Sequence, residues 1–195
     1  MQPADTFATR KAMGDIAEHH LRDLLTQRGA IVEMHQRNRD AAGGGAAVAH
    51  LGAGTIHLPD ISVTWAQHPV QRFGMECKAK HPLARGGFGW DQRAFDRAAR
   101  WSEMSGLPVF LAVRDLTAAP LPRIGAADEN EIYHWHVASV WKLLHSPNRY
   151  SDHHHHYWTG DDFVPLFVLL DGAADITAAM VPCVPAGPGQ PPLVL

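Results

Sequence analysis

The sequence predicts an α/β sandwich, in which helices cover a central sheet. Residues 8–27 and 90–105 have the periodicity of amphipathic helices, and the stretches between and after them have the pattern of strands. The chain has 195 residues, of which 46% are hydrophobic, so it can bury one substantial core. We therefore expect a single domain over residues 1–181.

The two helices are predicted from their spacing and from their end signals. In residues 8–27 apolar side chains recur at helical spacing, and Gly29 follows as a C-terminal stop. Residues 90–105 are followed by Gly106 and Pro108, which end the second helix. The apolar stripe of this second helix consists of Ala94, Phe95, Ala98 and Trp101.

The strands are predicted from alternation and from continuous hydrophobicity. Residues 56–65 and 72–80 alternate apolar and polar side chains, as the neighbouring strands of a hairpin would. Residues 107–113 are almost entirely apolar, which is typical of a central strand that is covered on both faces. Further expected elements are a strand at 30–36, a strand at 131–137, a short helix at 138–145 and a strand at 163–170.

Two stretches carry no regular pattern. Residues 41–54 are small and rich in glycine, and we expect them to form a mobile loop. Residues 182–195 contain five prolines, and we expect an extended C-terminal tail there. The predicted domain therefore ends before this tail.

Bulk composition narrows the class of protein. A net charge of −3 and a pI near 6.5 argue against a protein that coats nucleic acid with an overall basic surface, so such contacts must depend on local patches. The sequence lacks both the roughly 18-residue apolar run of a membrane span and a secretory leader pattern, and we expect a soluble, cytoplasmic protein. Cys77 and Cys183 match neither a disulfide framework nor a zinc motif.

One group of residues has the pattern of a reactive site. Asp60, preceded by Pro59, is followed sixteen residues later by the triplet Glu76-Cys77-Lys78. Successive residues of a strand point to opposite faces, so Glu76 and Lys78 share one face, roughly 6 to 7 Å apart. If the strand after Asp60 pairs beside them, two carboxylates and an ammonium group share one small site.

Such a site favours a metal-dependent reaction over a structural role. Desolvating unpaired charges costs several kcal/mol, and a divalent cation would offset that cost. Mg²⁺ prefers oxygen ligands, keeps several waters and can be held by one or two carboxylates together with a substrate phosphate. It stabilises developing charge and lowers the pKa of a bound water, which Lys78 could orient or help deprotonate.

The order of elements and the triplet resemble the PD-(D/E)XK signature of restriction endonucleases, Holliday-junction resolvases and many repair and phage nucleases. The resemblance spans roughly residues 8–114 and implies a restriction endonuclease-like α/β/α sandwich around a mixed central sheet. It implies that Asp60, Glu76 and the Cys77 carbonyl bind Mg²⁺, for which Mn²⁺ substitutes, and that Lys78 is the catalytic lysine. DNA is the implied substrate, in recombination, repair, restriction or phage DNA processing, and a homodimer is the implied assembly.

Two more residues are candidates for catalysis through this resemblance. Glu18 lies at the border of the apolar stripe of the first helix, one turn after Gly14, and many family members contribute a glutamate from that helix. The alternative for Glu18 is a solvated helix residue. Gln92 begins the second helix, where some family branches place a glutamine near the lysine, and its alternative is an ordinary polar residue of the first turn.

Several basic residues are candidates for DNA binding. Arg93, Arg97 and Arg100 share one face of the second helix, opposite its apolar stripe. Beside a metal site they would form a track for phosphate groups, and otherwise they form a solvated face. Lys80, His81 and Arg85 follow the triplet and could extend the track.

The remaining notable side chains have plainer interpretations. His153 to His156 form an internal run, which we interpret as a polar loop because neighbouring histidines in a loop cannot all reach one metal ion. Cys77 alternates with Glu76 and Lys78 and is expected to point into the core as an inert thiol.

Three functions therefore compete. The first is a Mg²⁺-dependent deoxyribonuclease, and the second is a non-catalytic nucleic-acid-binding or assembly subunit with the same fold. The intact set of Asp60, Glu76 and Lys78 counts against the second. The third is a histidine-rich metal-binding protein with an unrelated α/β fold.

Overall fold

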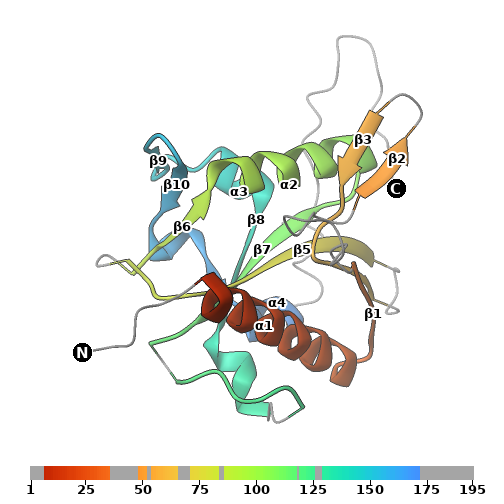
Figure 1. The fold of residues 1–195 in the computed structure, drawn as a ribbon, viewed down its shortest axis with the longest axis vertical. Helices are drawn as coiled ribbons and strands as arrows, with labels where there is room; N and C mark the ends of the chain where they lie inside the picture. The colour runs from red at the N-terminus through yellow and green to blue at the C-terminus, as the bar shows by residue number, and fades with distance from the viewer. Residues whose placement is uncertain are drawn as a thin grey trace.

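The computed structural model places a mixed sheet between two layers of helices (Figure 1). This confirms the predicted α/β/α sandwich around a mixed central sheet. Among the residues that the structure describes, none of the helices is long and apolar enough to cross a membrane. The described residues are 7–35, 48–51, 54–65, 71–83, 86–117, 119–125 and 129–171.

The described elements follow the predicted order, with additions. In chain order they are α1 (Phe7–Gln27), β1 (Ala30–Met34), β2 (Val48–Leu51), β3 (Gly54–His57), β4 (Ile61–Trp65), β5 (Gln71–Lys80), β6 (Phe88–Asp91), α2 (Gln92–Ser105), β7 (Val109–Asp115), η1 (Glu129–His134), β8 (Trp135–Ser139), α3 (Val140–Leu144), β9 (Tyr150–Ser151), β10 (His155–Trp158), η2 (Gly160–Asp162), β11 (Val164–Pro165) and α4 (Leu166–Asp171). The predicted tail at 182–195 lies outside the described residues.

The main sheet has the strand order β1-β4-β5-β7-β8-β11. Strands β5 and β7 are parallel, and the chain returns between them through α2, as a parallel pair requires. The other neighbouring pairs are antiparallel. Strand β5 is therefore a central strand, with β4 on one side and β7 on the other.

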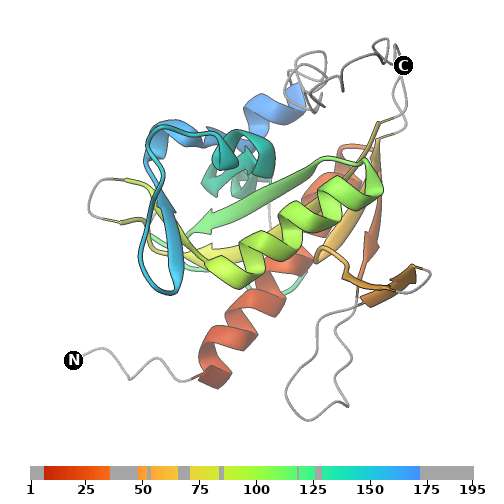
Figure 2. The ribbon, with the colours of Figure 1, turned by 90° about the horizontal axis from the view of Figure 1, so that it is seen from above.

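Each face of the sheet has its own hydrophobic core. Helix α1 covers the face on which Met75 and Cys77 of β5 point inward, together with apolar side chains of β4 and α4. Helices α2 and α3 cover the other face, where Leu111 and Val113 of β7 pack against Phe95. Figures 1 and 2 show α1 and α2 on opposite sides of the sheet. The buried Cys77 thiol is thus in the core, as predicted.

A second, three-stranded sheet of order β6-β10-β9 lies at one end of α2. The sequence pattern does not predict this sheet. His155 of β10 is opposite Asp91 of β6, and His156 is opposite Trp90. The prediction of a polar loop for the histidine run is therefore wrong for His155 and His156, since both belong to a strand. In Figure 2 this sheet and the β2–β3 hairpin lie at opposite sides of the molecule.

Four other predictions need correction. Residues 163–170 form the short edge strand β11 and then helix α4, which begins directly after Pro165. Residues 131–137 begin in a 3₁₀ helix before β8. The stretch 56–65 is divided between β3 and β4, and β2 and β3 lie partly within the glycine-rich stretch predicted as a loop.

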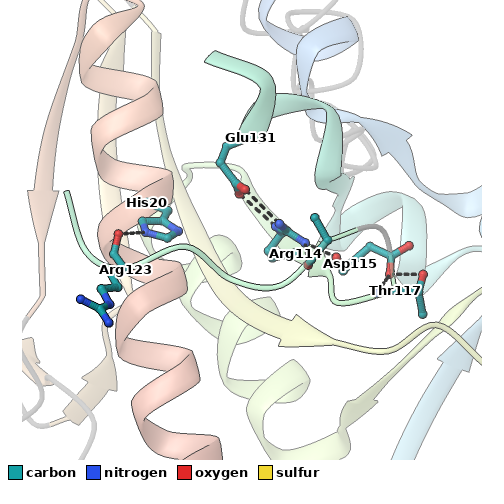
Figure 3. Close-up of polar contacts among 7 residues, drawn as sticks. His20, Arg114, Asp115, Thr117, Arg123 and Glu131 are labelled. Atoms are coloured by element: carbon teal, nitrogen blue, oxygen red, sulfur yellow. Dashed lines mark hydrogen bonds and ion pairs between the residues drawn. The ribbon is translucent and has the colours of Figure 1, made fainter. Parts of the chain in front are cut away.

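A buried ion pair fixes the carboxyl end of β7. The Arg114 side chain is 0% exposed and donates two hydrogen bonds of 3.0 Å to the Glu131 carboxylate (Figure 3). Its Nη1 also donates to the carbonyls of Asp115 and Ala119. Arg114 thereby ties η1 and the chain after β7 to the sheet.

We expect Arg114→Met to lower the free energy of unfolding by about 3 to 5 kcal/mol, because the Glu131 carboxylate would be left buried without its partner. The double variant Arg114→Met/Glu131→Met should lose less, since no charge remains buried. The control Arg149→Met removes an exposed arginine and should change stability by at most about 0.5 kcal/mol. Urea unfolding measures all three, and a double variant as unstable as the single one would contradict this role.

Candidate active site

Close contact between Pro59 and Gly74 positions the start of β4. A Cβ atom built on Gly74 would lie 2.7 Å from Pro59 Cγ and 3.3 Å from the Trp101 ring of α2. Only a residue without a side chain allows this approach. Pro59 therefore lies against β5, and Asp60 follows it at the junction with β4.

The Asp60 carboxylate is held by the backbone of β5. The Cys77 N–H donates to Asp60 Oδ2 at 2.8 Å, and the Lys78 ammonium lies 3.4 Å from the same oxygen. Asp60 is 8% exposed, so these partners offset part of the cost of burying its carboxylate. The β4–β5 register pairs Ile61 with Met75, which places Asp60 beside Glu76.

Three oxygen-bearing groups converge on the Lys78 ammonium. Its Nζ lies 2.7 Å from the Cys77 carbonyl oxygen, 3.4 Å from Asp60 Oδ2 and 4.0 Å from Glu76 Oε2. The Lys78 side chain is 29% exposed and that of Glu76 is 14% exposed. The structure therefore brings Asp60, Glu76 and Lys78 together at one partly open position of β5.

The chemistry of these donors fits Mg²⁺. Two carboxylates and a backbone carbonyl are hard oxygen ligands, and Mg²⁺ accepts such a set while keeping several waters. The convergence of their oxygens on one ammonium nitrogen shows that they can surround a cation. Among the described residues there is no group of three or more His, Cys, Asp or Glu side chains arranged to hold a metal ion.

Glu18 is half-buried and lies on α1, the helix that covers the face of β5 on which Cys77 points inward. Burial raises the pKa of the Cys77 thiol well above its usual range, and the charges of Asp60, Glu18 and Glu76 raise it further. The Glu18 charge therefore acts on the buried Cys77 sulfur, on the core side of β5. Its part in catalysis remains a prediction.

Lys80 and Trp90 extend the site along β5. The Lys80 ammonium donates to the Gly89 carbonyl and lies 5.4 Å from the centre of the Trp90 ring, while the Lys78 ammonium lies 5.7 Å from the same centre. Burial lowers the pKa of Lys80 to about 8, and the neighbouring Lys78 charge contributes. Two ammonium groups thus lie close to the same aromatic ring.

The arginines lie on the exposed face of α2. Arg93, Arg97 and Arg100 are all exposed, whereas Phe95, Ala98 and Trp101 are buried. Burial lowers the pKa of His57, and the Arg97 charge lowers it further, which places Arg97 near β3. Contact of these three arginines with DNA remains a prediction.

Gln92 and Arg93 line a pocket beside the site. Its other lining residues include Asp96 and His155, and its volume is about 690 Å³. The Gln92 N–H donates to the His154 carbonyl at 2.8 Å, which joins the start of α2 to the chain before β10. This bond serves the fold, and the catalytic role of Gln92 remains a prediction.

One predicted residue cannot be placed, and two residues near the site were not predicted. Arg85, predicted to extend the basic track, lies outside the described residues. Trp90 and His155 come together through the unpredicted β6–β10 pairing. The histidine run was a local signal for His155, but its interpretation as a polar loop hid the strand. The glycine at position 74, within an alternating strand, was a usable signal, because glycine inside a strand often marks a close approach.

Comparisons with known proteins give the following results. The chain matches no protein-family model and no curated protein. Among solved structures it is similar to Hjc, a Holliday junction resolvase from Archaeoglobus fulgidus, an archaeal hyperthermophile. The two chains are 13% identical, with a TM-score of 0.44, over 76% of this chain and 89% of that one. A similarity of this size carries no conclusion about function, so the function is inferred from the geometry of Asp60, Glu76 and Lys78.

Proposed function

We propose that this protein is a Mg²⁺-dependent nuclease of the PD-(D/E)XK type that hydrolyses phosphodiester bonds in DNA. The observation that supports the proposal best is the convergence of Asp60, Glu76 and Lys78 on adjacent strands of a mixed sheet. A set of two carboxylates and a lysine suits metal-assisted attack of water on phosphorus. Recombination, repair, restriction and phage DNA processing are the settings in which such an enzyme acts.

The proposed metal ligands are Asp60, Glu76 and the Cys77 carbonyl. Mg²⁺ bound there, or Mn²⁺ in its place, supplies Lewis-acid stabilisation of the phosphoryl group and an activated water. The Cys77 N–H holds Asp60 in place. The hydrophobic core around Cys77 keeps β5 rigid beneath these ligands.

Lys78 is proposed to act on the water and on the developing charge. In hydrolysis the water oxygen bonds to phosphorus, the bond to the leaving oxygen breaks, and that oxygen takes up a proton. Lys78 lies beside both carboxylates, where it can orient the attacking water and offset negative charge on the phosphoryl oxygens. Glu18 and Gln92 are proposed as supporting residues of the same site.

DNA binding is proposed to use Lys80, Arg93, Arg97 and Arg100, with Arg85 as a further candidate. Exposed arginines on one helix face can contact successive backbone phosphates without reading sequence. The family resemblance suggests a homodimer on duplex DNA. The net charge of −3 makes such a local track necessary, because the overall field does not attract DNA.

The roles of Asp60 and Lys78 can be separated by two variants. Asp60→Asn removes the charge but keeps an oxygen that can accept the Cys77 N–H bond, and Lys78→Met keeps the apolar stem without the ammonium. Both should lower the cleavage rate by roughly a hundredfold to ten-thousandfold. Asp60→Asn should weaken Mg²⁺ affinity strongly, whereas Lys78→Met should not, because removing a cation takes away no ligand.

Calorimetric Mg²⁺ titration and a cleavage time course on circular, linear and branched DNA measure these effects. Lys142→Met, which removes an exposed lysine of α3, is the control and should match the wild type in both measurements. Full activity in Lys78→Met would refute the mechanism. Cleavage that persists in a chelator would refute the metal requirement.

The arginine track is tested by the salt dependence of DNA binding. The triple variant Arg93→Ala/Arg97→Ala/Arg100→Ala should weaken binding to all sequences and reduce the slope of log K against log salt by about 0.9 for each phosphate that it no longer neutralises. Arg123→Ala removes an exposed arginine on the α1 side (Figure 3) and should leave the slope unchanged. An unchanged slope in the triple variant would mean that these arginines are simply solvated.

A further inference from the structure

A pocket of about 430 Å³ opens beside the carboxyl end of β5. This volume lies within the range of small-molecule sites, roughly 300 to 1,000 Å³. In Figure 1 this end of β5 passes between the first half of α1 and strand β6. The residues that line the pocket are Met13, Gly14, Lys78, Ala79, Lys80, His81, Leu83, Gly89, Leu116 and His155.

The lining combines two kinds of surface. Lys78, Lys80, His81 and His155 supply cationic or hydrogen-bonding groups, and none of the described residues that line the pocket is acidic. The rest is mostly apolar, from side chains such as Met13. A ligand that suits both parts carries an anionic group and an apolar or weakly polar group.

Gly14 keeps the α1 side of the pocket open. A Cβ atom at this position would meet nothing within 4 Å, so any side chain there would extend into free space. Glycine inside a helix is destabilising relative to alanine. No close neighbour requires a glycine here, so the space that Gly14 leaves is its main structural consequence.

Lys78 connects this pocket to the candidate metal ligands. It lines the pocket and also contacts Asp60 and Glu76. Lys80, further along the strand, is held by the Gly89 carbonyl at the pocket wall. Desolvation lowers the pKa of Lys80 to about 8, so a bound anion would favour its charged form. A nucleic-acid backbone with one phosphate beside Lys78 can therefore place the next phosphate beside Lys80.

We propose that this pocket holds one unpaired nucleotide of the DNA substrate, next to the bond that is cleaved. The phosphate of this nucleotide lies against Lys80 and His81, and its base lies against the apolar lining formed by Met13, Leu83 and Leu116. The identity of the ligand as part of a DNA substrate rests on the proposed nuclease function. The pocket itself can be tested without any cleavage.

The proposal defines a substrate class. A base in the pocket must leave the duplex stack, which costs most for a paired base and least for one that is already single-stranded or mismatched. The enzyme should therefore favour DNA that has an unpaired nucleotide beside the cleaved bond, such as a single-stranded end, a flap or a junction.

The binding test uses the metal-free protein in a chelator and 2′-deoxyadenosine 5′-monophosphate as the probe. NMR should show shifts at Gly14, Lys80 and His81, and calorimetry should give tighter binding than for inorganic phosphate or deoxyadenosine. Gly14→Leu should weaken binding by about tenfold or more, and His81→Ala by about the same factor. Ala12→Leu, on an exposed face of the same helix, and His145→Ala, at the exposed end of α3, are matched controls.

Specific outcomes would overturn the proposal. Equal affinities for inorganic phosphate and for the nucleotide would mean that the base does not bind in the pocket. An unchanged nucleotide affinity in Gly14→Leu would mean that the nucleotide binds elsewhere. Cleavage assays separate this inference from the proposed function. The wild type should cut DNA with an unpaired nucleotide faster than nicked, fully paired DNA. Gly14→Leu should cut both substrates at similar rates. Nucleotide binding without any cleavage would refute only the nuclease function, and cleavage with no such preference would refute only the pocket.

Discussion

The hydrogen bond from the Cys77 N–H to the Asp60 carboxylate is the contact on which the candidate site depends. A nearly buried carboxylate is stable only when its partners offset its desolvation, and this N–H, together with the Lys78 ammonium, supplies them. The β4–β5 register places Asp60 beside Glu76, and this bond holds the carboxylate there. Strand pairing brings the two residues together, and the hydrogen bond orients the Asp60 side chain.

The sequence was sufficient for features that depend on local pattern. Helix α1, helix α2 and strands β4 and β5 each have a periodicity that matches how they are buried, and the continuous apolar run of β7 matches a strand that is buried on both faces. Alternation along β5 also gave the correct face for Cys77 and, opposite it, for Glu76 and Lys78. The proximity of Asp60 followed once β4 and β5 were treated as neighbours. These features follow from residues that are close in sequence or joined by a simple hairpin.

What the sequence did not show depends on contacts between distant segments. Strand β6 pairs with β10, so Trp90 and His155 reach the site only through the tertiary structure. Residues 163–170 are apolar throughout, and such a short run can be either a strand or a buried helix. Leu166 and Leu170, one helical turn apart, are both buried, which shows that packing against the core selected the helix.

The charges around Trp90 favour a binding role for this end of β5 over a purely structural one. Two ammonium groups, from Lys78 and Lys80, lie within 6 Å of one indole ring, and desolvation makes the Lys80 charge unfavourable. Hydrophobic residues of similar size would stabilise the fold at least as well. The two carboxylates and the Gly89 carbonyl offset part of this cost. An anionic ligand at the same position would offset more of it, which connects the electrostatics of the strand to a phosphate-bearing substrate.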